Sequence, residues 1–177
     1  LALKGHHVVR LKSGDPLIFG RAGEEIAALE ARGIGYTVVP GITAGVAMAA
    51  ALGVSLTHRD CARSVRFVTG HSRHGGLPAD LDWRAVAEPN ATTLFYMGGR
   101  TAAQIASRLR GAGLAADTPV AIGIAIGQAG QQLLVTDLAG LERGLEPTLL
   151  HQPVLIAVGE VFRQRSRMPD RICVGHI

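Results

Sequence analysis

The chain has 177 residues, of which 47% are apolar and only 4% aromatic, and its formal net charge at pH 7 is +4. This length and apolar content are enough for one large globular domain or two small ones. The basic residues are mostly arginine; this is typical of a solvated basic surface, and the alternative is a site for an anionic ligand. Nucleic-acid binding is disfavoured, because no lysine–arginine block is present and aromatic residues for base stacking are scarce.

Membrane and secreted classes are also disfavoured. The apolar stretch 42–54 has thirteen residues, too few to span a bilayer. No signal peptide is recognisable, although the chain opens on Leu1 rather than Met. Cys61 and Cys173 do not form a CxxC pair, so we expect a reduced cytoplasmic protein.

The first third of the chain alternates between two kinds of predicted element. Residues 6–14 predict a strand that runs into a turn, and residues 36–41 predict a second strand. Residues 42–53 predict a helix of small residues that packs closely against a sheet. This alternation is typical of parallel strands with helical crossovers. A helix over residues 21–33 lies between the strands, and its apolar face consists of Ala22, Ile26 and Leu29.

The pattern changes after residue 57. A helix over residues 100–113 is predicted from the apolar face of Ala102, Ile105, Ala106 and Leu109. The later strands have short connections, which predicts that part of this sheet is antiparallel. We therefore expect residues 1–58 to be the remnant of an N-terminal αβα domain with parallel strands. Residues 59–177 would form a C-terminal αβα domain with a mixed five-stranded sheet, its strands at 65–71, 92–99, 119–127, 131–138 and 153–161.

The loop "SGDP", residues 13–16, is the first candidate ligand site. Gly14 lets the backbone approach a ligand, and Asp15 can accept a hydrogen bond from a hydroxyl or an amine. A ligand at the carboxyl end of a parallel strand is the general expectation for such an architecture. The alternative is an ordinary tight turn in which Asp15 caps the helix, since short glycine motifs occur often by chance.

Two further strand ends carry candidate contacts. In "VVPGITAG" the hydroxyl of Thr43 and free backbone N–H groups would lie at the same sheet edge as Asp15, although Thr43 could equally be a helix cap. In "LFYMGGR" the thioether of Met97 could contact a ligand or belong to the core.

Metal and hydrolase chemistry have no support in the motifs. His71 and His74 lie in "TGHSRHGG", but no HExxH or Cys/His cluster accompanies them, so we expect no metal. No GxSxG nucleophile elbow is present, and "GRAGEE" lacks the Gly-Lys-Ser/Thr of a phosphate-binding loop.

Six motifs together indicate a family. They are "VVRLKSGDPLIFGRAGEE", "VVPGITAG", "GVSLTHRD", "FVTGH", "TLFYMG" and "PVLIAVGEV", in this order and at this spacing. The set closely resembles the uroporphyrinogen-III C-methyltransferases, a group within the tetrapyrrole methylase family, over essentially the whole chain. "RLKSGDPLIFGR" followed by "VPGIT" and "LTHR" points to this group rather than to later enzymes of the cobalamin pathway.

The resemblance implies a two-domain αβα enzyme with S-adenosylmethionine as methyl donor in a cleft between the domains. It implies methylation of two ring carbons of uroporphyrinogen III, an anionic tetrapyrrole, to give precorrin-2 for siroheme and cobalamin. It also implies a homodimer. The arginines expected near the substrate carboxylates are Arg10 and Arg21. The residues expected at the cofactor are Ser13, Gly14, Asp15, Ile18, Thr43, Ala44, Met97 and Ile126.

The chain departs from the family pattern at three places. Ser13 stands where the family usually has glycine, and "IAIGQAGQQ" replaces an acidic, polar segment. The glycine-rich loop that opens the family, and the residues proposed for proton transfer, are not in this sequence. We therefore expect a C-terminal fragment with its catalytic residues upstream of Leu1, inactive by itself. The alternatives are another precorrin methyltransferase and a non-catalytic binding or dimerisation module.

Overall fold

The computed structural model describes residues 1–73 and 75–166, and contacts between residues divide the chain into two units. The first unit comprises residues 1–44 and the second residues 45–177. The division falls in the first turn of helix α2, Ala44–Leu52, whereas the sequence pattern placed a domain boundary at residue 58. The assignment of residues 1–58 and 59–177 to two αβα domains stays a prediction.

The first unit contains one of the predicted helices and neither of the predicted strands. Helix α1, Ala22–Glu30, forms as predicted, and a 3₁₀ turn, η1, occupies Ala2–Lys4. The two predicted strands, residues 6–14 and 36–41, have no regular structure, so this prediction is wrong. A strand needs a neighbouring row of backbone N–H and C=O groups, and no described segment forms a ladder with either stretch.

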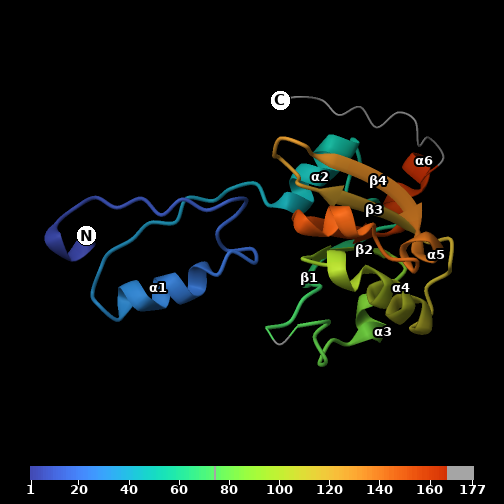
Figure 1. Ribbon diagram of the computed structural model, residues 1–177, viewed down its shortest axis with the longest axis horizontal. Helices are drawn as coiled ribbons and strands as arrows, with labels where there is room; N and C mark the ends of the chain where they lie inside the picture. The colour runs from blue at the N-terminus through green and yellow to red at the C-terminus, as the bar shows by residue number, and fades with distance from the viewer. Residues whose placement is uncertain (74, 167–177) are drawn as a thin grey trace. The chain divides into compact units, whose positions relative to one another are not determined.

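The second unit is built on a five-stranded mixed sheet, as predicted (Figure 1). Its spatial order is β1-β2-β5-β3-β4. β1 pairs with β2 in parallel, and β5 is antiparallel to both β2 and β3. β1, β2 and β3 therefore run in one direction, and their carboxyl ends share one edge of the sheet. The strands are β1 Ser64–Thr69, β2 Ala91–Tyr96, β3 Pro119–Ile124, β4 Gln132–Asp137 and β5 Val154–Val158.

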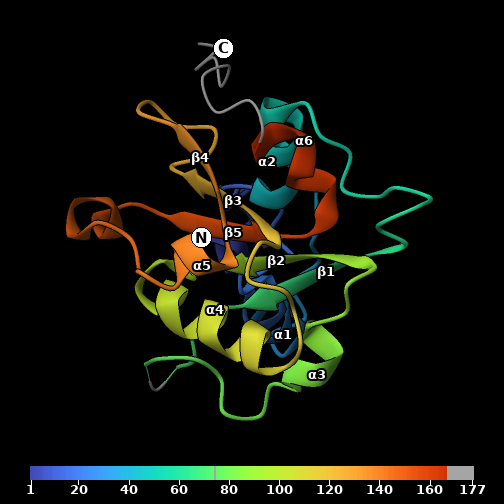
Figure 2. The ribbon, with the colours of Figure 1, turned by 90° about the vertical axis from the view of Figure 1, so that its right-hand side faces the viewer.

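Helices cover both faces of this sheet, which confirms the αβα fold class (Figure 2). On one face α4 buries the apolar residues predicted for it, among them Ile105 and Leu109, against Phe95, Ile122 and Ile156. α2 lies on the other face. The remaining helices are α3 Trp83–Val86, α4 Ala102–Gly111, α5 Leu138–Leu141 and α6 Arg163–Ser166, with 3₁₀ turns η2 Gly99–Thr101, η3 Pro147–His151 and η4 Glu160–Phe162.

Helix α2 packs closely on the sheet because it presents small residues, as the sequence predicted. A Cβ atom added to Gly45 would lie 2.8 Å from both the Leu94 Cδ2 and Tyr96 Oη atoms. Further along the helix, the Met48 sulfur would lie 2.7 Å from a Cβ atom added to Gly123 of β3. The interface between helix and sheet therefore depends on glycine on both sides.

Candidate functional site

The two loops singled out in the first third of the chain meet within the first unit. A Cβ atom added to Gly41 would lie 2.1 Å from the carbonyl oxygen of Gly14, so no side chain fits there. Gly14 itself has φ of 69°, a left-handed conformation that glycine adopts without strain. The "SGDP" loop and the Pro40–Gly41 turn are thus in direct backbone contact.

Asp15 fastens these loops together. Its Oδ1 atom accepts a hydrogen bond from the backbone N–H of Leu17 at 2.8 Å, and its Oδ2 atom accepts from Gly41 at 3.1 Å. Each carboxylate oxygen has a second lone pair, so Asp15 can hold the loops and still accept from a ligand. The side chain expected to bind the cofactor is therefore also the clamp of the site.

The other residues of this unit that were expected at the cofactor lie beside Asp15. A Cβ atom on Gly14 would lie 3.8 Å from Thr43 Cα and 3.9 Å from Ala44 N, and the backbone N–H of Ile18 donates to the Asp15 carbonyl at 3.3 Å. Thr43 is buried, whereas Ser13 is exposed. The structure thus gathers in one place Ser13, Gly14, Asp15, Ile18, Thr43 and Ala44.

Met97 and Ile126, the other two residues expected at the cofactor, belong to the second unit. Met97 follows β2 and Ile126 lies two residues after β3, so both are at the carboxyl edge of the sheet. Met97 is half exposed with φ of 60°, and Ala125, next to Ile126, has φ of 50°. Non-glycine residues rarely adopt positive φ, and such strain concentrates at functional sites. The edge therefore carries backbone features typical of a binding region.

Both arginines expected near the substrate are paired with glutamates of α1. Arg10 Nη2 lies 3.4 Å from Glu25 Oε1, and Lys12 Nζ lies 2.8 Å from the same oxygen. Arg21 donates two hydrogen bonds to Glu24, at 3.0 and 2.6 Å. An anionic substrate must therefore compete with carboxylates that are already in place. The i,i+3 spacing of Arg21 and Glu24 in the sequence is itself a signal for this pair.

These pairs change the protonation behaviour of their members. The hydrogen bond to Glu24 raises the pKa of Arg21 above its ordinary value. The hydrogen bond from Lys12 lowers the pKa of Glu25, and the charge of Arg10 adds to this effect. Glu25 therefore remains ionised, and Arg21 charged, throughout the neutral range.

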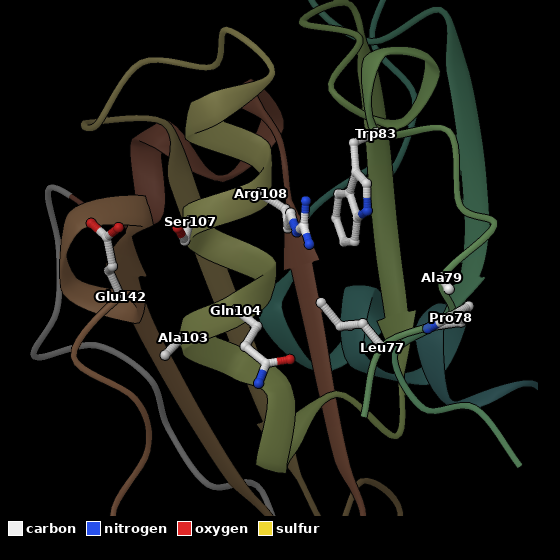
Figure 3. Close-up of a pocket in the computed structure, with 9 residues that line it drawn as sticks. All are labelled: Leu77, Pro78, Ala79, Trp83, Ala103, Gln104, Ser107, Arg108 and Glu142. Carbon is white, nitrogen blue, oxygen red and sulfur yellow. The ribbon is translucent and has the colours of Figure 1, made fainter. Parts of the chain in front are cut away.

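A groove of about 600 Å³ lies elsewhere, on the second unit (Figure 3). Gln104 and Arg108 project from α4 toward the segment that holds Leu77 and Trp83. None of the residues expected at the cofactor or the substrate lines it. The residues that carry the family motifs therefore do not form this groove.

The described side chains and helices give no sign of a metal site or of a membrane span. Residues 1–73 and 75–166 contain no group of three or more His, Cys, Asp or Glu side chains arranged to hold a metal ion. His74, considered with His71 as a metal ligand, lies outside the described residues. Within the same ranges, every helix is too short or too polar to cross a bilayer.

Comparison with known proteins defines the class. The family model of Tetrapyrrole (Corrin/Porphyrin) Methylases matches residues 1–142. The chain therefore belongs to the tetrapyrrole methylase family, whose members are methyltransferases of tetrapyrrole biosynthesis.

Individual relatives agree with this family. The siroheme synthase of Pseudomonas fluorescens (strain SBW25) is 46% identical over 168 residues, which cover 95% of this chain and 36% of that protein. The chain thus spans about a third of the length of the curated relatives that it matches. The native uroporphyrin III C-methyl transferase from Thermus thermophilus matches with a TM-score of 0.76 at 32% identity, covering 92% of this chain and 68% of that one. Its complex with S-adenyl homocysteine matches with a TM-score of 0.74 at 32% identity, covering 92% and 70%.

Proposed function

We propose that the full-length protein methylates uroporphyrinogen III at two ring carbons, with S-adenosylmethionine as the methyl donor, to give precorrin-2. The observation that carries this proposal is the meeting of the "SGDP" loop with residues 41–44, clamped by Asp15. These loops hold the motifs on which the resemblance to the family rests. The similarity to a uroporphyrin-III C-methyl transferase whose structure contains S-adenyl homocysteine supports the same assignment.

The geometry of the loops fits a polar donor molecule. Gly14 and Gly41 let the two loops approach each other closely, and Asp15 has lone pairs for a hydroxyl or an amine. The donor supplies an electrophilic methyl group on a sulfonium centre. The residues proposed to hold it are Ser13, Gly14, Asp15, Ile18, Thr43 and Ala44, and Met97 and Ile126 of the second unit are proposed as further contacts.

Methyl transfer requires little covalent chemistry from the side chains of the protein. The methyl group would pass from the sulfonium sulfur to a ring carbon that already carries a side chain and no hydrogen, and charge balance would be restored by loss of a proton from another position of the macrocycle. Alignment of donor and acceptor is the main contribution that such a site makes, because it replaces an unfavourable encounter with a fixed geometry. Rigid loops, such as those clamped by Asp15, suit this role.

Arg10 and Arg21 are proposed to bind the carboxylates of the tetrapyrrole. Both side chains are exposed, at 69% and 78%. Arg21 already holds Glu24 with two hydrogen bonds, and this planar geometry can be transferred to a substrate carboxylate. Before the substrate binds, Glu24 and Glu25 would hold the side chains of these two arginines in place. We also propose, on the family resemblance alone, that the protein is a cytoplasmic homodimer.

Another precorrin methyltransferase is the second candidate, and Ser13 together with the segment "IAIGQAGQQ" favours it. The test is to supply the full-length protein with S-adenosylmethionine and either uroporphyrinogen III or a tetrapyrrole that is already methylated. We expect faster turnover of uroporphyrinogen III. A preference for the methylated substrate would replace the proposal with the second candidate. Failure to bind S-adenosylhomocysteine in calorimetry would indicate a non-catalytic module.

A further inference from the structure

The buried side chain of Tyr96 provides a hydrogen-bond acceptor for the first turn of helix α2. The backbone N–H of Gly45, the second residue of the helix, donates to the Tyr96 hydroxyl oxygen at 2.9 Å in buried surroundings. The first N–H groups of a helix have no partner within the helix, and a buried N–H without a partner is costly. The Tyr96 side chain is therefore a tertiary cap on α2, contributed by strand β2.

The position of this phenol is fixed from two sides. Its ring packs edge-to-face on Phe67 of β1, with centroids 5.7 Å apart and an interplanar angle of 70°. Its hydroxyl lies against Gly45, where an added Cβ atom would be only 2.8 Å away. The start of α2 cannot rotate or shift along the sheet without losing this hydrogen bond or colliding with Tyr96.

The residues adjacent in sequence to Gly45 and Tyr96 connect this hydrogen bond to the proposed donor site. Thr43 and Ala44 immediately precede Gly45, and Met97, with φ of 60°, immediately follows Tyr96. All three neighbours are proposed donor contacts. We propose that Tyr96 is a positioning residue, which holds the Thr43–Ala44 backbone in the geometry that binds the methyl donor. This inference rests on the proposed function.

The test is Tyr96→Phe in the full-length protein, with S-adenosylhomocysteine as the probe. The substitution keeps the ring and removes the acceptor, so the start of α2 becomes ordered only when the ligand binds. We expect the Kd for S-adenosylhomocysteine to rise roughly tenfold, because the binding-competent fraction falls. The KM for S-adenosylmethionine should rise similarly, with kcat at saturation changed less than about twofold.

Thr93→Val is the matched control. Thr93 is a buried residue of the same strand, and its hydroxyl donates to the Val86 carbonyl at 3.4 Å, away from α2. Its removal should lower the melting temperature and leave the Kd unchanged. If Tyr96→Phe behaves like Thr93→Val, Tyr96 has a structural role only and the inference is wrong.

Two further results distinguish a failure of the proposed function from a failure of the role proposed for Tyr96. If the wild-type protein does not bind S-adenosylhomocysteine, the proposed function fails rather than the role of Tyr96. If Tyr96→Phe does not fold, hydrogen exchange of the Gly45 amide in the wild type decides the question. Added S-adenosylhomocysteine should slow that exchange at least about tenfold, as expected when ligand stabilises the ordered helix start. Unchanged exchange at saturating ligand would overturn the inference.

Discussion

At the scale of single residues, Asp15 has the largest structural role in the candidate site. Asp15→Ala removes the acceptors for Gly41 and Leu17 and separates the two loops. We expect this variant to bind S-adenosylhomocysteine about 1–3 kcal/mol more weakly, the range for losing a hydrogen bond to a charged group. Asp15→Asn keeps one accepting oxygen and should lose less. Calorimetry on folded variants checks this order, and wild-type affinity in Asp15→Ala would exclude Asp15 from the site.

Arg21 offers a test of substrate charge. Arg21→Ala should raise the KM for uroporphyrinogen III and leave the Kd for S-adenosylhomocysteine nearly unchanged. Arg21→Lys should rescue only partly, because a point charge lacks the planar pair of donors. Glu24→Gln removes the competing carboxylate and should lower the substrate KM. Steady-state kinetics in which all three variants resemble the wild type would show that another arginine binds the substrate.

How far the sequence predicts the site depends on how local each contact is. The "SGDP" and "PGITA" loops were recognisable because glycine positions mark close backbone approach, and the structure brings the two loops together. The clamp between Asp15 and Gly41 spans 26 residues, and the bond between Gly45 and Tyr96 spans 51. No periodicity or turn signal encodes such pairs, since they follow from the tertiary packing of the segments.

At the scale of elements, α1 is linked to the segment before the "SGDP" loop by Glu25. Hydrogen bonding from Lys12 lowers the pKa of Glu25, so this link is fully formed above the pKa of an unfolded glutamate. It is lost as the pH falls through the lowered pKa of the folded state. We expect hydrogen exchange of the α1 amides to accelerate in that acidic range, beyond the intrinsic dependence on pH. Glu25→Gln should remove this dependence, and identical profiles for both proteins would contradict the prediction.

The contact of α2 with the sheet can be tested at Gly123. An added Cβ atom would lie 2.7 Å from the Met48 sulfur and 2.8 Å from Ile126, so Gly123→Ala should destabilise the protein by about 1–3 kcal/mol. Gly111→Ala is the matched control, because no described atom lies within 4 Å of its added Cβ and it sits in α4. That variant should be neutral or stabilised by up to about 1 kcal/mol. Equal stability of the two variants in urea unfolding would disprove close packing at Gly123.

The elements divide into those that local sequence determines and those that need a partner. α1 and α4 were predicted from apolar periodicity and α2 from a run of small residues, and each satisfies most of its backbone internally. The five strands of the second unit pair with one another. The stretches 6–14 and 36–41 have the composition of strands but lack a ladder among the described residues. Composition therefore predicted that these stretches tend to form strands, but it could not predict whether a neighbouring strand pairs with them.

At the scale of the whole molecule, the resemblance to the family was more informative than composition. Net charge, length and glycine content excluded several classes but were compatible with many α/β proteins. The ordered set of motifs singled out tetrapyrrole methylases, and the family model and the solved relatives confirm that family. Apolar side chains of the first unit, such as Leu11 at 84% and Val39 at 77%, are exposed, although both stretches were expected to form strands.

The most direct measurement of the proposed activity is the mass of the product. The full-length protein is incubated with uroporphyrinogen III and an excess of S-adenosylmethionine, and the tetrapyrrole is analysed by mass spectrometry at successive times. We predict that a singly methylated intermediate appears first and is converted to a product with two added methyl groups, the mass of precorrin-2. Asp15→Ala should slow both steps at subsaturating donor. An unmodified tetrapyrrole after many expected turnovers, from a protein that binds S-adenosylhomocysteine, would show that uroporphyrinogen III is not the substrate.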